Sequence, residues 1–268
     1  MKMYTVGGCV RDEILGLKSK DIDFTVVLDE RDLRNSGVED ETDLFKKMVF
    51  ELHNRGFKIH VEHPEHLTVR AQFPKGHPSP VRDADFVLAR KEGAYSDGRR
   101  PDTVQPGTLH DDLARRDFTM NAIAKDTDGN LIDPFGGIKD IENKIIRAVG
   151  SPMERFNEDS LRMLRAVRFK VTKGFLLDHD IMQALHNEEL LTKLGNVSSE
   201  RVMDELNKML HFDTLRSLKV LESFPGLRDV VFSGRVSIGA TMKQKGRGGR
   251  GKIPNPAPTT SITCFGGK

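Results

Sequence analysis

The sequence is poor in cysteine and has no long apolar run. Its two cysteines, Cys9 and Cys264, lie at opposite ends of the chain without a nearby set of Cys or His residues, which argues against a disulfide framework and against a zinc site. No run approaches the ~20 apolar residues that would span a bilayer, and no charged-then-apolar leader precedes Gly7. We therefore expect a cytoplasmic protein without a membrane partner.

Histidines are present but scattered. Three of them, His60, His63 and His66, come closest to a metal-ligand spacing. Pro64 lies between them and favours a loop or a strand over a helical face. We expect no metal site there.

Positive charge is concentrated at one end of the chain. The formal net charge of the 268 residues is +2, yet residues 230–268 contain seven basic residues and no acidic ones, which leaves about −5 for residues 1–229. The Gly-rich basic segment 243–252 and the Pro/Thr/Ser-rich stretch after it are typical of a flexible tail that contacts RNA phosphate. A tail that only aids solubility is an equal alternative.

The spacing of apolar residues predicts an α+β fold followed by helices. In the first 148 residues we expect strands at 3–6, 22–28, 57–60, 67–72, 86–89 and 131–133, and helices at 10–17 and 42–55. The polar stretch 90–110 is rich in helix and strand breakers and predicts a long loop. Beyond residue 151 only helical spacing continues, at 157–170, 178–186, 198–210 and 213–221.

Two carboxylates open the second predicted strand. Asp21 and Asp23 precede the apolar run 24–28, and residues at i and i+2 of a strand project from the same face. Such a pair can hold two divalent cations roughly 3.5–4 Å apart, one activating an attacking hydroxyl and the other steadying a leaving pyrophosphate. The pair predicts nucleotidyl transfer, although a solvated strand start is the alternative for the pair taken alone.

A glycine turn precedes this acidic strand. Gly7 and Gly8 follow the strand 3–6 and precede the helix 10–17, whose first backbone N–H groups would face an anionic phosphate. Arg11 adds a permanent cation. A Gly-Gly turn alone is usually only a turn, but the order turn, helix, acidic strand is much more specific.

Two later segments extend the candidate site. In the segment 83–90 we take Asp85 as a third catalytic carboxylate. Asp83 lies on the same face of the strand and is an alternative candidate. The other alternative is that both acids merely flank a loop. In the segment 111–122 adjacent arginines precede an acid, and guanidinium forks fit triphosphate oxygens bidentately. We expect three residues of this segment to bind the nucleotide, namely Arg116, Asp117 and Asn121. A surface Arg–Asp pair is the alternative.

The predicted helix 157–170 carries an acid and several arginines. Asp159 and Arg162 are i and i+3 neighbours, and a carboxylate beside a guanidinium matches the amino group and the unprotonated ring nitrogen of cytosine and adenine. The alternative is that acids in a first turn only serve the helix dipole. Arg165 is within reach of phosphate or base, whereas Arg168 points nearly opposite to Asp159 and is expected to brace the domain junction or meet RNA.

These segments, in this order, resemble the tRNA nucleotidyltransferase family of the bacterial and eukaryotic type, the CCA-adding enzymes, together with the bacterial poly(A) polymerases. The matching segments are 6–12, 20–27, 112–124, 132–137, 156–169 and 200–206. The resemblance covers about residues 1–222. It implies a DNA polymerase beta-like nucleotidyltransferase head with a mixed sheet at 1–148, an all-helical neck domain at 149–225, and a basic, Gly/Pro-rich tail at 226–268.

The resemblance also implies an activity, namely addition of C and A from CTP and ATP to the tRNA 3′ end. In the implied site Asp21 and Asp23 bind Mg²⁺. The triphosphate would be contacted by Gly8, Arg11 and Arg116, next to Gly7. The incoming base would be selected by Asp159 and Arg162, with help from Arg165 and Arg168.

The resemblance weakens after the predicted neck. Such enzymes usually continue into body and tail domains that hold tRNA, whereas about 45 largely basic, breaker-rich residues follow here. Transfer chemistry is therefore better supported than tRNA selection, and the oligomeric state is left open. The alternatives are a poly(A) polymerase, an enzyme adding only C or only A, a small-molecule nucleotidyltransferase, and an RNA-binding protein without catalysis.

Overall fold

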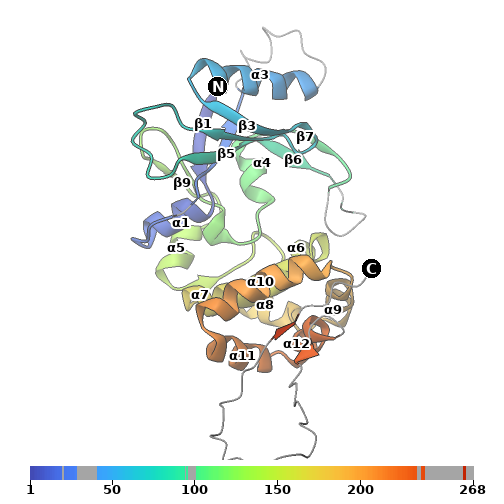
Figure 1. Cartoon of the computed structure of the whole chain (residues 1–268). Coiled ribbons are helices and arrows are strands. Elements are labelled where there is room, and N and C mark those ends of the chain that lie inside the picture. The colour runs from blue at the N-terminus through green and yellow to red at the C-terminus, as the bar shows by residue number, and fades with distance from the viewer. Residues whose placement is uncertain are drawn as a thin grey trace, which may run out of the picture.

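The computed structural model describes residues 1–19, 21–28, 41–93, 95, 101–233, 237–238 and 262–263. Figure 1 shows the sheet of the N-terminal half at the top, under helix α3, and the helices of the C-terminal half below it. The predicted order, a domain with a mixed sheet followed by helices, is confirmed.

The described head is built on a seven-stranded sheet in the order β3-β4-β5-β2-β1-β8-β9. The strands are β1 Lys2–Val6, β2 Asp23–Val27, β3 Lys58–His63, β4 Thr68–Gln72, β5 Asp83–Leu88, β8 Ala124–Lys125 and β9 Leu131–Ile132. The pair β2 and β5 is parallel, whereas the other neighbours are antiparallel. The sheet is therefore mixed.

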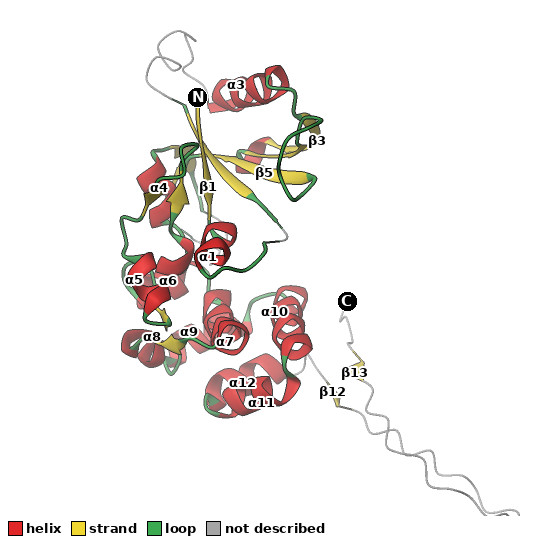
Figure 2. Cartoon of the chain, turned by 90° about the vertical axis from the view of Figure 1, so that its left-hand side faces the viewer, coloured by secondary structure: helices red, strands yellow, loops and turns green. Residues whose placement is uncertain are grey.

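Helix α3, Glu41–Asn54, covers one face of this sheet (Figure 2). Burial alternates along β5, where Ala84, Phe86 and Leu88 are buried and join the apolar side chains of α3 in one core. Because successive strand residues point to opposite faces, Asp83 and Asp85 lie on the other face, which α3 leaves uncovered.

Short elements lie between the strands of the sheet and between the sheet and the helical half. They are α1 Gly8–Ile14, η1 Pro64–His66, β6 Arg90–Glu92, β7 Val104–Pro106, α4 Leu109–Ala114, η2 Thr119–Asn121, α5 Gly137–Glu142 and β10 Ile145–Ile146. The predicted long loop at 90–110 is wrong in part, because β6 and β7 pair as an antiparallel ribbon. Strands of three residues carry too little periodicity to be recognised in a sequence.

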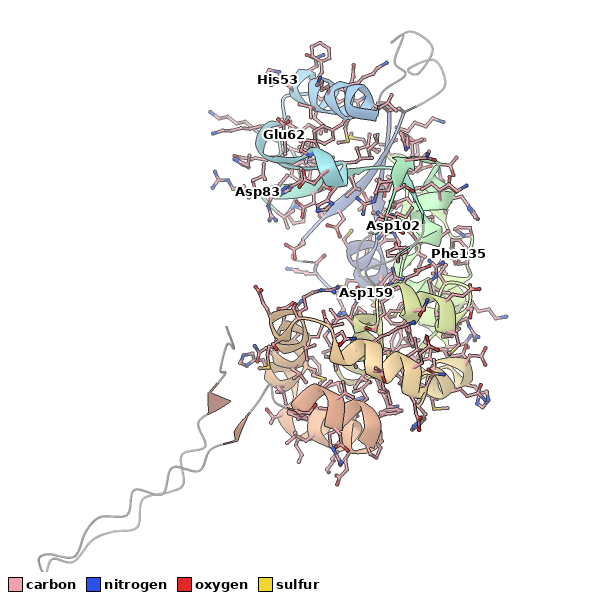
Figure 3. All side chains as sticks on the ribbon, turned by 90° about the vertical axis from the view of Figure 1, so that its right-hand side faces the viewer. His53, Glu62, Asp83, Asp102, Phe135 and Asp159 are labelled. Carbon is pink, nitrogen blue, oxygen red and sulfur yellow. The ribbon has the colours of Figure 1, made fainter. Side chains whose placement is uncertain are left out.

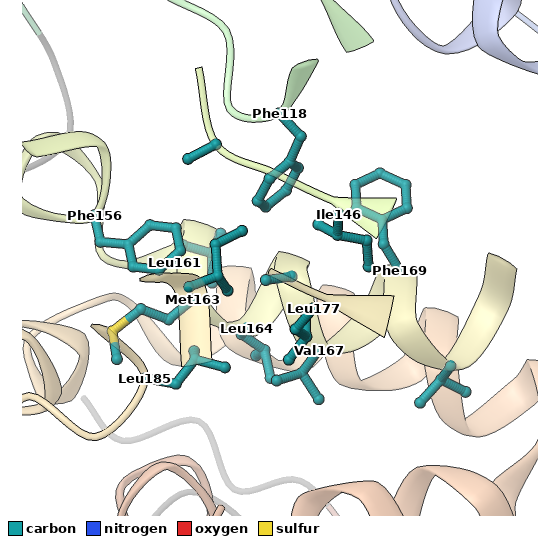
Figure 4. Packing of buried hydrophobic residues seen from close by; sticks show 14 of the residues in the cluster. Phe118, Ile146, Phe156, Leu161, Met163, Leu164, Val167, Phe169, Leu177 and Leu185 are labelled. Atoms are coloured by element: carbon teal, nitrogen blue, oxygen red, sulfur yellow. The ribbon is translucent and has the colours of Figure 1, made fainter. Parts of the chain in front are cut away.

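The helical half surrounds α7, Leu161–Lys173. The other elements are α6 Pro152–Glu158, β11 Leu176–Leu177, α8 His179–Ala184, α9 Glu188–Gly195, α10 Ser199–Phe212, α11 Thr214–Glu222 and α12 Pro225–Phe232. Met163, Leu164 and Val167 of α7 are fully buried, and Figure 4 shows them packed with Phe118 and Phe156. This core continues into the head through Val10, Phe118 and Met120, so α7 and the head share one apolar cluster.

Two predicted boundaries in the helical half need correction. The predicted helix 157–170 is broken, since α6 ends at Glu158, Asp159 is extended and α7 begins at Leu161. The helices also run past the predicted neck boundary at 225, because Leu227 and Val231 of α12 are buried in the shared core. Most of the predicted tail lies outside the described residues, apart from α12, Ser233 and the two-residue strands β12 Ser237–Ile238 and β13 Ile262–Thr263. Within the described ranges, no helix has the length and apolarity needed to cross a bilayer.

Candidate active site

A cleft of about 670 Å³ collects nearly all the predicted site residues. The predicted residues that line it are Gly7, Gly8, Arg11, Asp21, Asp23, Arg116, Asp117, Asn121, Asp159, Arg162, Arg165 and Arg168. Unpredicted lining residues are Arg115, Leu161, Phe169, Arg201 and Lys208. Figure 3 shows Asp83 on the sheet of the head and Asp159 at the helical half, where that half meets the head. The lining thus joins residues more than a hundred positions apart in the sequence.

The acidic pair is divided by the start of β2, since Asp21 lies two residues before the strand. Asp23 is the first residue of β2. Its register partners on the two neighbouring strands are Val6 of β1 and Asp85 of β5. Burial raises the pKa of the Asp23 carboxyl; the Arg116 guanidinium opposes that shift, and the charges of Asp85 and Asp21 add to it. Asp23 is therefore a carboxylate whose negative charge is poorly compensated by the protein.

A divalent cation fits this pair if the substrate supplies further ligands. Across the described residues, no three His, Cys, Asp or Glu side chains lie close enough together to hold an ion by themselves. Mg²⁺ is usually bound by one or two carboxylates plus substrate phosphates and water. Asp21 and Asp23 match that pattern, and the uncompensated charge at Asp23 favours a cation there.

The glycine turn lies directly beside the acids. Gly7 adopts φ 78° and ψ −135°, which L side chains rarely adopt. A Cβ atom on Gly7 would stand 2.7 Å from Nη1 of Arg116 and 3.8 Å from Oδ2 of Asp23. Only glycine therefore permits this close approach of backbone, arginine and carboxylate.

Arg11 is held rigidly at the floor of the cleft. Its Nη1 donates to Oδ1 of Asn121 at 2.6 Å, its Nε donates to Asp12 at 2.9 Å, and its guanidinium lies 5.1 Å from the centre of the Phe169 ring. Lys173 of α7 donates to the same Asp12 carboxylate at 2.8 Å. These contacts tie α1 of the head to the helical half.

Asp112 is a buried anchor that sequence reasoning missed. It is fully buried and accepts hydrogen bonds from Thr25 of β2 at 2.7 Å, from Arg115 at 2.6 Å and from Arg116 at 3.0 Å. Burial would raise the pKa of Asp112, but the two guanidinium groups outweigh it and hold the pKa at about 2. Asp112 therefore fixes Arg116 relative to the strand that carries Asp23.

Asp117 fixes the position of Arg165 in the same way that Asp112 fixes Arg116. It accepts from Nε and Nη2 of Arg165 at 2.9 and 2.6 Å and from the amide of Asn121 at 2.9 Å. Burial would raise the pKa of Asp117, but Arg165 and Asn121 lower it to about 2. In this structure the carboxylate of Asp117 is occupied by protein donors.

Glu205 of α10 is a second unpredicted anchor. It is 3% exposed and pairs with Arg165 and with Arg168. Arg168 also lies 4.0 Å from the centre of the Phe169 ring. The predicted bracing role of Arg168 fits these contacts, and it lines the cleft as well.

Asp159 and Arg162 line the cleft but are held by different partners. Asp159 accepts from Nη2 of Arg201 at 2.7 Å, whereas Arg162 donates to Glu158 at 2.7 Å and to two backbone carbonyls. Because Asp159 lies in the break before α7, the predicted helical i, i+3 geometry is wrong. An acceptor and a donor nevertheless face the same cleft.

Asp85 and Asp83 differ in their surroundings. Asp85 lies opposite Asp23 on the neighbouring strand and forms an ion pair with Arg70, 3.5 Å from Nη1 to Oδ2. Asp83, two residues away, contacts Nε2 of His60 at 3.2 Å. Only Asp85 therefore adjoins the acidic pair, although it does not line the cleft itself.

One feature of the sequence could have identified the unpredicted residues Arg201 and Glu205. They fall in the segment 200–206 that matched the tRNA nucleotidyltransferase pattern. On α10 they are i and i+4 neighbours and so share one face of the helix. Their partners, 40 positions or so earlier, cannot be read from sequence spacing.

Together with this fold, the paired acids and the arginines around them define the class of nucleotidyltransferases. The chain belongs to the poly(A) polymerase head domain family, whose model matches residues 3–147.

Several CCA-adding enzymes are similar to this chain. That of Streptococcus gordonii is 34% identical over 263 residues, which cover 98% of this chain and 56% of the relative. That of Bacillus subtilis is 36% identical over 231 residues, 83% of this chain and 51% of the relative. The chain thus spans about half the length of the curated relatives it matches.

Solved structures give the same result. The Bacillus stearothermophilus CCA-adding enzyme in complex with CTP superposes with a TM-score of 0.64 at 32% identity, covering 84% of this chain and 48% of that one. The Thermotoga maritima CCA-adding enzyme complexed with tRNA has a TM-score of 0.64 at 27% identity, covering 87% and 49%.

Proposed function

We propose that this chain adds C and A from CTP and ATP to the 3′ end of tRNA. The terminal 3′-hydroxyl attacks the α-phosphate of the nucleotide, and pyrophosphate leaves. The observation that carries the proposal is the single cleft in which Asp21 and Asp23 face the arginines and Asp159. Similarity to CCA-adding enzymes solved with CTP and with tRNA supports the choice of substrates.

Asp21 and Asp23 are the residues that would hold Mg²⁺. When bound there, the ion supplies charge neutralisation for the attacking hydroxyl and the leaving pyrophosphate. Asp85, on the strand next to Asp23, is the carboxylate we assign to the side of the attacking hydroxyl. There its negative charge favours loss of the hydroxyl proton.

The triphosphate lies, in this proposal, between the glycine turn and Arg116. Because Gly7 has no side chain, the Arg116 guanidinium can lie directly against the backbone of the turn, so a phosphate bound there would meet both. Arg116 and Arg11 are held in place by Asp112 and Asn121, so they offer preorganised donors to the phosphate oxygens. Pyrophosphate is then stabilised as it leaves.

The hydrogen-bonding groups of Asp159 and Arg162, at the start of α7, select the base in this proposal. Asp159 accepts a hydrogen bond from the amino group of cytosine or adenine, and Arg162 donates to the unprotonated ring nitrogen beside it. Uracil and guanine present the reverse order and are rejected, because their groups would be left unpaired. Arg162 must then share or exchange its present bond to Glu158.

The test is incorporation of labelled CTP and ATP into tRNA that lacks its 3′ end, with UTP and GTP as competitors. Wild-type protein is expected to add C and A, and Asp23→Ala protein is expected to add neither. No incorporation by either protein would overturn the proposal. Product length on a sequencing gel separates CCA addition from C-only, A-only or poly(A) addition. With tRNA as the acceptor, we place the protein in the cytoplasm.

A further inference from the structure

A row of charged residues crosses three neighbouring strands of the sheet. Arg70 of β4 lies opposite Asp85 of β5, and Asp85 lies opposite Asp23 of β2. Residues paired directly across strands project from the same face. Arg70 therefore stands on the face that α3 leaves uncovered, two strands from Asp23 and on the side away from β1 and Gly7.

Asp23 thus has a guanidinium on each side, from Arg116 and from Arg70. The two side chains differ in exposure and in how firmly ion pairs hold them. Arg116 is 18% exposed and is fixed by its 3.0 Å bond to Asp112. Arg70 is 52% exposed, and among the residues that the structure describes its one ion pair is the 3.5 Å contact with Asp85. That distance is long for a charged pair, which is typically 2.7–2.9 Å. Arg70 retains donors for a second anion.

The proposed reaction requires two anionic substrates on opposite sides of the acids. In an in-line displacement the attacking hydroxyl approaches the phosphorus from the side away from the leaving pyrophosphate. The glycine turn and Arg116 occupy the side towards β1. The acceptor strand must then approach over β5 and β4, where Arg70 is the cation aligned with Asp23.

We propose that Arg70 binds a backbone phosphate near the 3′ end of the acceptor RNA and so places the terminal hydroxyl beside Asp23 and Asp85. The guanidinium has five N–H donors, so it can keep Asp85 while it binds the phosphate. The inference rests on the proposed function and adds to it a positioning residue for the acceptor. A merely structural Arg70 would neutralise Asp85 and leave RNA binding unchanged.

The experiment compares Arg70→Ala and Arg70→Lys with a matched control, Arg55→Ala. Arg55 follows α3, on the covered side of the sheet, and donates to the carbonyl of Met1. Two quantities are measured on the full chain: KM for acceptor tRNA and for CTP, and equilibrium binding of the same RNA without nucleotide over a salt series.

Arg70→Ala is expected to raise both KM and Kd for the RNA about tenfold and to reduce the salt slope of binding by about one. The KM for CTP stays within about twofold of wild type, Arg70→Lys recovers most of the RNA affinity, and Arg55→Ala changes neither quantity. Unchanged RNA affinity and salt slope in Arg70→Ala, or a higher KM for CTP alone, would overturn the inference.

Failure of the proposed function is distinguishable from failure of this inference. If wild-type protein transfers no nucleotide, the proposed function is wrong. The binding measurement then still decides on Arg70: a weaker complex with a smaller salt slope supports the phosphate contact, and an unchanged complex contradicts it.

Discussion

Arg201 of α10 holds the carboxylate of Asp159 with two nitrogens, at 2.7 Å from Nη2 to Oδ2 and at 3.3 Å from Nη1 to Oδ1. Asp159 lies in the extended break between α6 and α7, where its Oδ1 also accepts from the backbone N–H of Leu161 at 3.2 Å. Since a carboxylate has about four acceptor sites, Asp159 can accept from a base while Arg201 orients it. In the proposed function, base recognition would therefore depend on Arg201 as well, 42 positions after Asp159 in the sequence.

Replacing Arg201 by Met is expected to raise the KM for both CTP and ATP about tenfold, because a charge-assisted bond of about 1.5–3 kcal/mol no longer orients Asp159. Steady-state incorporation kinetics measure this. Arg228→Met serves as the control, since Arg228 on α12 pairs with the exposed Asp229. An unchanged KM for CTP in Arg201→Met would show that Asp159 needs no help.

Replacing Gly7 by Ala is expected to weaken triphosphate binding at least tenfold, because the new methyl group would stand 2.7 Å from Nη1 of Arg116. The matched control is Gly16→Ala. Gly16 has a similar φ of 69° but nothing within 4 Å of the added carbon. Gly16→Ala should lose about 1–2 kcal/mol of stability from its positive φ, Gly7→Ala should lose at least as much, and only Gly7→Ala should raise the KM for CTP. Equal KM values in the two variants would contradict the close approach.

The sequence was informative wherever a local pattern decides the structure. The i, i+2 spacing of Asp21 and Asp23 predicted that they lie together, and both line one cleft although β2 begins only at Asp23. Gly7 was recognised because a turn between strand and helix is a local motif, whereas strand periodicity alone left Asp83 and Asp85 equivalent. Asp112 and Glu205 were missed because their importance lies in partners 40 or more positions away or on other elements. The break at Asp159 was missed because Asn157 and the acids after it look like the start of a helix, while they form the end of α6.

Asp85→Asn is expected to lower kcat about a hundredfold, because the carboxylate beside Asp23 would no longer favour deprotonation of the hydroxyl. Asp83→Asn is the control, since Asp83 contacts His60 on the outer strand β3 and should retain kcat within about twofold. The measurement is single-turnover incorporation at saturating CTP and tRNA. A larger loss in Asp83→Asn would reverse the assignment of the third carboxylate.

Acid should destabilise the protein through Asp112 and Asp117. Both have a folded-state pKa of about 2, below the ~3.9 of an unfolded aspartate. The stability they contribute is therefore complete above pH ~4 and is lost as the pH falls through ~2, by about 2 kcal/mol each. Urea unfolding between pH 7 and pH 2 should show this fall. Asp117→Asn should remove about half of it, whereas Asp128→Asn, in an exposed turn, should leave it unchanged.

Asp23 should behave in the opposite way to these anchors, since burial and its acidic neighbours raise its pKa. A carboxyl with a raised folded-state pKa lowers stability as the pH rises from its unfolded pKa to its folded pKa, and the loss is complete above the folded pKa, so without metal at pH 7 Asp23→Asn is expected to be more stable than wild type. With CTP present to supply the remaining ligands, Mg²⁺ at ten times its Kd should add about 1.4 kcal/mol to wild type, a rise in Tm of about 3–5 °C, and should add nothing to Asp23→Asn. Thermal unfolding with and without Mg²⁺ measures both effects, with Asp83→Asn as a control that keeps the Mg²⁺ response. An equal Mg²⁺ response in Asp23→Asn would mean that the ion binds elsewhere.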